Sequence, residues 1–198
     1  MQTEVMDIPA GKIAAIVTHL EMVQPPRATP LAAPNGLALR QISCPAIAWY
    51  KALYRQIGEN WLWFSRLAMS DDALEAVLTD PLVEVYALSR GDQDLGLMEL
   101  DFRQPESCEL VFLGITDELI GTGAGRYLMA AATARAWSQD IARFHVHTCS
   151  LDHPGAMGFY QKAGFAARRQ QVEIADDPRL LGLLPETAAP QVPLLRTA

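Results

Sequence analysis

A glycine-rich turn is the part of this sequence best suited to binding a charged ligand. Its residues are Leu119-Ile120-Gly121-Thr122-Gly123-Ala124-Gly125-Arg126. Alternate glycines let the backbone approach a ligand closely and point successive N–H groups toward it. A helix is predicted to begin in this turn, so its positive dipole end would favour an anion, and Arg126 invites the same. The turn therefore predicts a pyrophosphate site, with a tight strand-to-helix turn that binds nothing as the alternative.

Two common phosphate-binding motifs do not fit this turn. The dinucleotide fingerprint needs a glycine where Arg126 stands, and an acidic residue at the end of a following strand. A P-loop needs Gly-Lys followed by serine or threonine after four intervening residues, and the sequence has no such run here. A nucleotide-binding regulatory domain is therefore disfavoured.

A second motif occupies residues 152–165, which read Asp-His-Pro-Gly-Ala-Met-Gly-Phe-Tyr-Gln-Lys-Ala-Gly-Phe. It resembles the second signature of the GNAT superfamily of acyl-CoA-dependent N-acetyltransferases, which ends in an alanine, a tyrosine, a basic residue and Gly-Phe. The turn from Ile120 to Gly125 resembles the first signature of that superfamily, Arg/Gln-x-x-Gly-x-Gly/Ala. One predicted helix and one strand separate the two motifs, as in the superfamily, and the match covers about residues 83–174.

The resemblance implies acetyl-CoA as co-substrate and an amine as acceptor. The backbone from Ile120 to Arg126 would cradle the pyrophosphate, although Ile120 replaces the Arg/Gln of the signature and loses its side-chain contribution. The asparagine that precedes the second helix in the family corresponds to Asp152 or His153, depending on a one-residue choice of alignment. His153 could hydrogen-bond the pantetheine arm. Arg126 and Lys162 could meet the coenzyme phosphates or be ordinary exposed cations.

Acetyl transfer to an amine has three chemical requirements, and each has a candidate. The resemblance implies that backbone N–H groups of Leu113, Gly114 and Ile115 hold the oxyanion, if the strand is splayed or bulged there. Tyr160 is the candidate acid for the departing thiolate, with a tyrosine packed in the core as the alternative. Glu109 is the candidate base, because a carboxylate beside an apolar strand can be partly desolvated, which raises its pKa. The alternative is a solvated acid, and Glu99, Asp101 or water could replace it.

Two other groups of residues have a possible chemical role. His145, His147 and Cys149 would share one face of a strand, but no carboxylate or fourth ligand completes a metal site, so we predict no metal. These residues are expected to line the wall facing the acceptor or the core. An aromatic group near the first two predicted helices suggests an acceptor pocket, with core packing as the alternative. Its members are Tyr50, Tyr54, Trp61, Trp63 and Phe64.

The elements that must position these residues follow from hydrophobic periodicity and turn signals. Strands are predicted at 12–19 (an edge strand), 36–41, 83–89, 95–102, 108–115, 143–149 and 166–174. Helices are predicted at 46–57, from Ser70 onward, from the glycine turn to about Gln139, and at 155–163. The order indicates a mixed α/β sheet, mostly antiparallel and GNAT-like, with helices on both faces.

We expect three regions in the chain. Residues 1–35 are an N-terminal strand and a proline-rich linker, residues 36–176 form the acetyltransferase domain, and residues 177–198 are a C-terminal strap containing a short helix. The 198 residues carry a net charge of −7, which argues against a nucleic-acid partner. No membrane span or signal peptide is apparent, and three scattered cysteines suit a reducing cytoplasm.

The sequence thus predicts an acetyl-CoA-dependent N-acetyltransferase that acts on a small-molecule or protein amine, as a monomer or homodimer. The amine is predicted to attack acetyl-CoA directly, because nothing in the sequence supports Cys149 as a nucleophile. The alternative function is a non-catalytic acyl-CoA-binding module.

Overall fold

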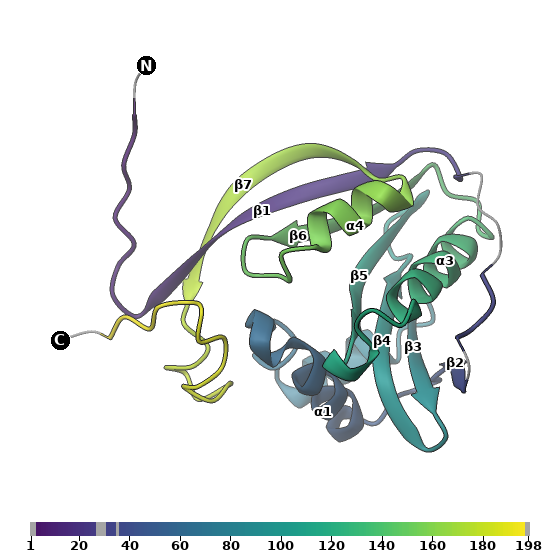
Figure 1. The fold of residues 1–198 in the computed structure, drawn as a ribbon, viewed down its shortest axis with the longest axis horizontal. Coiled ribbons are helices and arrows are strands. Elements are labelled where there is room, and N and C mark those ends of the chain that lie inside the picture. The colour runs from purple at the N-terminus through teal and green to yellow at the C-terminus, as the bar shows by residue number, and fades with distance from the viewer. Residues whose placement is uncertain (1–2, 27–30, 35, 197–198) are drawn as a thin grey trace.

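The structure is a computed structural model that describes residues 3–26, 31–34 and 36–196. Within these residues seven strands form one sheet in the order β2-β3-β4-β5-β6-β1-β7, and only the β5–β6 pair is parallel (Figure 1). The strands are β1 (Lys12–Met22), β2 (Leu37–Gln41), β3 (Val83–Arg90), β4 (Gln93–Asp101), β5 (Ser107–Ile115), β6 (Arg143–Cys149) and β7 (Ala166–Asp176). The predicted mixed, mostly antiparallel α/β fold is confirmed.

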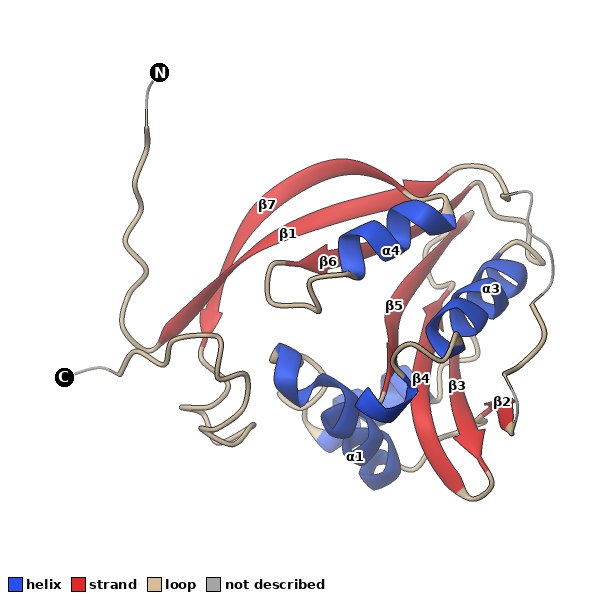
Figure 2. Cartoon of the chain, viewed as in Figure 1, coloured by secondary structure: helices blue, strands red, loops and turns tan. Residues whose placement is uncertain are grey.

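Helices cover both faces of the sheet, as predicted (Figure 2). They are α1 (Ile47–Gly58), α2 (Asp71–Leu78), α3 (Ala124–Ala136) and α4 (Ala156–Ala163), with short 3₁₀ turns at η1 (Glu59–Trp61) and η2 (Asp117–Leu119). Helices α3 and α4 bury Leu128, Met129 and Tyr160 against one face, while α1 and α2 bury Tyr50 and Leu74 in a second core on the other. Helix α3 ends at Ala136, slightly before the predicted end near Gln139.

Local signals explain most of these elements. Helix α2 begins where the sequence predicted it, because the Ser70 side chain accepts a hydrogen bond from the Ala73 N–H and two aspartates follow in the first turn. Strands β3, β4 and β5 form the expected antiparallel meander. Strand β4 is buried from Leu95 to Leu100 because helices cover both of its faces.

The position of β1 corrects the sequence prediction. Residues 12–19 were expected to form an edge strand, but β1 lies inside the sheet, antiparallel to β6 on one side and to β7 on the other. Strand β7 occupies the edge instead. The β1 segment is apolar on both faces, with Ile13 and Val17 on one and Leu20 on the other, which suits an interior strand. Figure 1 shows β1 and β7 running together as a long arch.

The C-terminal segment also differs from the prediction. No helix forms in residues 177–196 of the described chain; the segment is a series of turns that we call the strap. A buried ion pair between Asp177 and Arg179 organises it, and Arg179 also donates to the backbone carbonyls of Ala188, Val192 and Pro193. These carbonyls accept hydrogen bonds from the Arg179 side chain and not from the backbone N–H groups of a helix. Leu184 packs with the α1 core.

Among the described residues no helix is both long enough and apolar enough to cross a membrane. The proline-rich linker predicted between residues 24 and 34 falls partly outside the described residues.

Candidate active site

Strands β5 and β6 separate shortly after they begin. They pair only where Ser107–Glu109 faces Arg143–His145, and the register of β5 against β4 also shifts near Val111. Beyond Glu109 one edge of β5 therefore has no strand neighbour, and residues 111–115 line a cavity of about 540 Å³. This is the splayed and bulged strand on which the prediction for Leu113, Gly114 and Ile115 depended.

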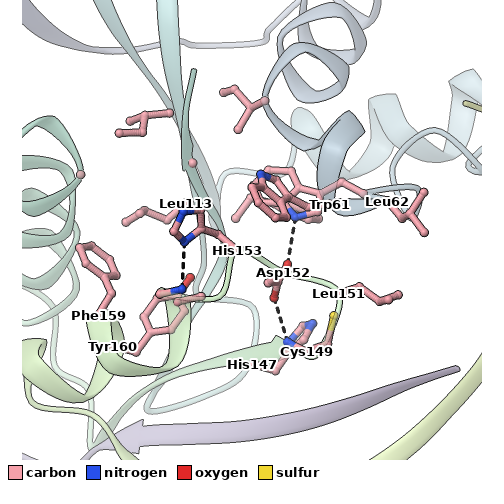
Figure 3. Close-up of a pocket in the computed structure, with 18 of the residues that line it drawn as sticks. Trp61, Leu62, Leu113, His147, Cys149, Leu151, Asp152, His153, Phe159 and Tyr160 are labelled. Carbon is pink, nitrogen blue, oxygen red and sulfur yellow. Dashed lines mark hydrogen bonds between the residues drawn. The ribbon is translucent and has the colours of Figure 1, made fainter. Parts of the chain in front are cut away.

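The cavity brings together most of the predicted site residues, and Figure 3 labels Leu113, His153 and Tyr160 among them. Those that line it are Leu113, Gly114, Ile115, Ile120, Gly121, Gly123, Gly125, Arg126, His153 and Tyr160. Four predicted residues are not part of the lining: Glu109, Thr122, Ala124 and Lys162. Thr122 holds the turn closed, since its hydroxyl donates to the Leu119 carbonyl at 2.7 Å. Ala124 is buried in the core, and Lys162 is exposed on α4.

The glycine turn has the geometry of an anion site. Gly121 and Gly123 have φ values of 82° and 91°, a left-handed conformation that few other residues adopt. Helix α3 begins directly after them, so its first N–H groups lack partners within the helix and the positive end of its dipole faces the cavity. Arg126 adds a cation on the same side. The exposed side chain of Ile120 adds neither a charge nor a hydrogen-bond donor to this turn.

Tyr160 reaches the cavity from the second turn of α4 (Figure 3). Its ring packs edge-on against Phe159 and Phe165, with centroid separations of 5.6 and 6.0 Å. Burial raises the pKa of its phenol well above the ordinary value, and the charge of Asp152 adds to the rise. The hydroxyl therefore carries its proton at neutral pH and can donate it.

The loop after β6 gives Asp152 and His153 different surroundings. Both carboxylate oxygens of Asp152 bind within the chain: they accept from the Thr148 hydroxyl at 2.7 Å and the Cys149 N–H at 2.8 Å, and from Trp63 Nε1–H at 3.2 Å. His153 instead lies at the cavity, where its Nδ1 accepts from the Gly155 N–H at 2.9 Å. Asp152 holds the loop, and the exposed His153 lines the cavity.

Glu109 lies behind the cavity wall and contacts it through a histidine. His147 lines the cavity, and its Nδ1 is 3.3 Å from Oε1 of Glu109. The expectation that the pKa of Glu109 is raised is wrong. The contact with His147 lowers it more than burial raises it. The same contact raises the pKa of His147, with burial opposing it.

The neighbours of His147 on β6 line different cavities. Cys149 lines the cavity, but His145 turns toward a smaller cavity of about 310 Å³ together with Glu109 and Asp101. In residues 3–26, 31–34 and 36–196 no group of three or more His, Cys, Asp or Glu side chains is arranged to hold a metal ion. Burial raises the pKa of Cys149 to about 11, so its sulfur is a thiol at neutral pH.

The reserve carboxylates are engaged elsewhere. Glu99 is fully buried on the α1 side of the sheet, where it accepts from the Tyr50 hydroxyl and from Arg66. Asp101 is paired with Arg103. Neither lines the cavity, so neither is placed to receive a proton from a bound amine.

Comparison with known proteins identifies the family. The model of the GNAT acetyltransferase domain matches residues 58–176, more than half of the chain. The chain belongs to the GNAT family. A mycothiol acetyltransferase from Jonesia denitrificans is 34% identical over 76 residues, which is 38% of this chain but only 24% of that protein.

Solved GNAT structures share the fold. An aminoglycoside acetyltransferase from an uncultured soil metagenomic sample, in complex with sisomicin, superposes with a TM-score of 0.56 and 16% identity, covering 70% of this chain and 94% of that one. A GNAT acetyltransferase from Novosphingobium aromaticivorans superposes with a TM-score of 0.58 and 14% identity, covering 85% and 68%. The family model and the shared fold agree on a GNAT acetyltransferase domain in this chain.

The far end of this GNAT cavity contains residues that the sequence did not point to. Ile13, Ala15 and Val17 of β1 line it, together with Glu173 and Ala175 of β7. The prediction of residues 12–19 as an edge strand excluded Ile13, Ala15 and Val17 from the site. No sequence motif marks these three residues, Glu173 or Ala175. Of the predicted aromatic group, Tyr54, Trp61, Trp63 and Phe64 line the cavity, whereas Tyr50 is buried in the core.

Proposed function

We propose that this GNAT protein transfers an acetyl group from acetyl-CoA to a primary amine by direct attack. The proposal rests on one arrangement: an anion cradle, a free strand edge and a protonated tyrosine face the same cavity. The mycothiol acetyltransferase relative and the aminoglycoside acetyltransferase neighbour are consistent with an amine acceptor.

The donor would lie along the α3–β5 side of the cavity. The backbone of Gly121, Gly123 and Gly125 would bind the pyrophosphate, and Arg126 would add charge attraction. The amide groups of the pantetheine arm would pair with the free edge of β5, as an added strand does, with His153 as a further partner. The thioester carbonyl would then point toward the N–H groups near Leu113–Ile115.

Each proton in the reaction has a proposed carrier. The amine gives up a proton to Nε2 of His147, while Glu109 holds Nδ1 and supports the charge that develops on the ring. The nitrogen lone pair attacks the carbonyl carbon, a C–N bond forms, and the C–S bond then breaks. Tyr160 donates its proton to the departing thiolate. In this scheme Glu109, the candidate base of the sequence, acts through His147 as a positioning residue.

A thermal-shift titration tests the donor site. Acetyl-CoA or CoA at 100 times its dissociation constant is expected to stabilise the protein by about 2.7 kcal/mol, or several degrees in Tm. NAD and ATP at equal concentration are the controls, because the turn lacks the features of their motifs. A shift with NAD alone, or with none of these ligands, would contradict the proposal.

The pH dependence of the reaction tests the His147–Glu109 pair. In the wild type, kcat/KM for the amine is expected to rise with pH through a pKa above the ordinary histidine value of about 6.5, because Glu109 stabilises the imidazolium form. Glu109→Gln removes that charge, so this rise is expected at lower pH. Asp101→Asn also removes one negative charge, but Asp101 pairs with Arg103 and not with His147. The pH profile of this variant should therefore match that of the wild type. An unchanged profile in Glu109→Gln would exclude His147 as the base.

A further inference from the structure

The acceptor end of the cavity is a slot between two apolar walls, which we call the acceptor cleft. One wall is the β1–β7 arch, with Ile13, Ala15, Val17 and Ala175. The other is formed by the segment from α1 to just past η1, with Tyr54, Trp61, Trp63 and Phe64. Such walls favour the burial of an apolar body, and a highly hydrated acceptor would lose its water here without replacement partners.

The aromatic wall is held in a fixed shape. Trp63 packs against Tyr54 and Phe112 at centroid distances of 5.4 and 5.3 Å, and its indole N–H is bound by Asp152. Glycines make room for this ring: a Cβ on Gly58 would lie 2.4 Å from Cβ of Trp63, and one on Gly114 would lie 2.9 Å from its Cη2. A fixed wall selects acceptors by shape and does not adapt to many of them.

The strap connects the two walls from outside the cavity. It runs from the end of β7 to η1, where Gln191 Nε2–H donates to the Asn60 carbonyl at 2.8 Å. Leu184 of the strap belongs to the same core cluster as Ile13 and the buried residues of α1. No described residue of the strap lines the cavity, so the strap contributes to the acceptor cleft by holding its two walls in place.

The charge of the cleft is concentrated at one carboxylate. Glu173 of β7 lines the cleft, and its side chain makes no hydrogen bond or ion pair with the described part of the chain. Strand β1 pairs Ala15 with Glu173 on one side and His19 with His147 on the other, so both side chains lie on the same face of the sheet and line the same cavity. Asp152 is occupied by its own loop. The other carboxylate of the cavity without a partner among the described residues, Asp117, lies on η2 beside the glycine turn and so at the opposite end. One free carboxylate in the cleft matches one ammonium group, not the several of a polycation, and it repels an acidic acceptor.

We infer that the acceptor is a monoamine with an apolar, aromatic-sized body, captured as its ammonium form by Glu173 and delivered to His147. This inference rests on the proposed function and gives it a substrate class. Glu173 is a binding residue in this scheme: it attracts and orients the amine, while the proton transfer and the attack take place at His147 and the thioester.

The experiment measures release of CoA with four amines: 2-phenylethylamine, hexylamine, spermidine and glutamate. The inference expects kcat/KM for the two apolar monoamines to exceed that for spermidine and glutamate at least tenfold. Glu173→Gln is expected to raise KM for 2-phenylethylamine about tenfold while kcat stays within twofold. Asp176→Asn is the matched control, because Asp176 lies on the same strand, pairs with Lys12 at 2.6 Å and does not line the cleft.

The outcomes separate this inference from the proposed function. If spermidine or glutamate is the better acceptor, or if Glu173→Gln leaves KM unchanged, the substrate class is wrong and amine acetylation stands. If no amine in the panel is acetylated although acetyl-CoA raises Tm, the proposed transfer to an amine is contradicted. The inferred substrate class, which rests on that transfer, is then contradicted as well.

Discussion

Tyr160→Phe is expected to lower kcat about a hundredfold or more and to leave the affinity for acetyl-CoA unchanged. General acid catalysis contributes roughly 10²–10⁴-fold, and the phenol is the protonated group that α4 brings to the cavity. Phenylalanine keeps the ring contacts with Phe159 and Phe165, and the described residues provide no hydrogen bond to the hydroxyl that the variant would lose. Steady-state kinetics give kcat, and a thermal-shift titration gives the coenzyme affinity.

Tyr127→Phe is the matched control for this substitution. Tyr127 lies on α3, is half-buried and does not line the cavity, so its variant should retain full activity. If Tyr160→Phe keeps kcat within threefold of the wild type, the thiolate takes its proton from water or another group. If the wild-type protein binds acetyl-CoA but acetylates no amine, the alternative of a non-catalytic acyl-CoA-binding module is favoured.

Arg179→Met is expected to destabilise the fold by about 3–5 kcal/mol, the usual cost of removing one partner of a buried ion pair. Both members of the pair are almost completely buried, and the carbonyls of Ala188, Val192 and Pro193 would lose their donor as well. Urea unfolding measures the loss, which corresponds to a fall in Tm of roughly 6–20 °C for a chain of this size. The KM for the amine should also rise, because the strap connects the two walls of the acceptor cleft.

Arg196→Met is the comparison, since Arg196 pairs with Glu186 on the exposed side of the same strap. Exposed pairs contribute about 0–1 kcal/mol, so that variant should unfold close to the wild type. Should Arg179→Met unfold like Arg196→Met, the strap is held by the packing of Leu184, Ala188 and Ala189 and not by the arginine.

The sequence was informative wherever structure depends on local chemistry. Ser70 with two aspartates predicts a helix start, and the alternating glycines from Gly121 predict a turn that a helix follows, because both signals act within a few residues. The donor end of the site is built from such signals, and the cavity contains ten of its predicted residues. The roles of those residues remain predictions until they are tested.

The acceptor end could not be predicted because it depends on distant contacts. The apolar residues on both faces of segment 12–22 suit an interior strand, but only the pairing with β6 and β7 shows which strands lie beside it. Glu173 belongs to the site for the same reason. The pKa of Glu109 is lowered and not raised as predicted, because His147 lies beside it although it is 38 positions away in the sequence.

The interior position of β1 has a consequence for how the chain folds. Ile16 bonds to Ser150 across 134 residues of sequence, and Lys12 bonds to Asp176 across 164. Contacts of such high order form slowly, so β1 cannot take its place before β6 and β7 exist. The meander and its helices can assemble earlier from nearby partners. During synthesis on the ribosome, the apolar faces of β1 therefore stay exposed until most of the chain has been made. This strand is the segment most in need of protection from aggregation.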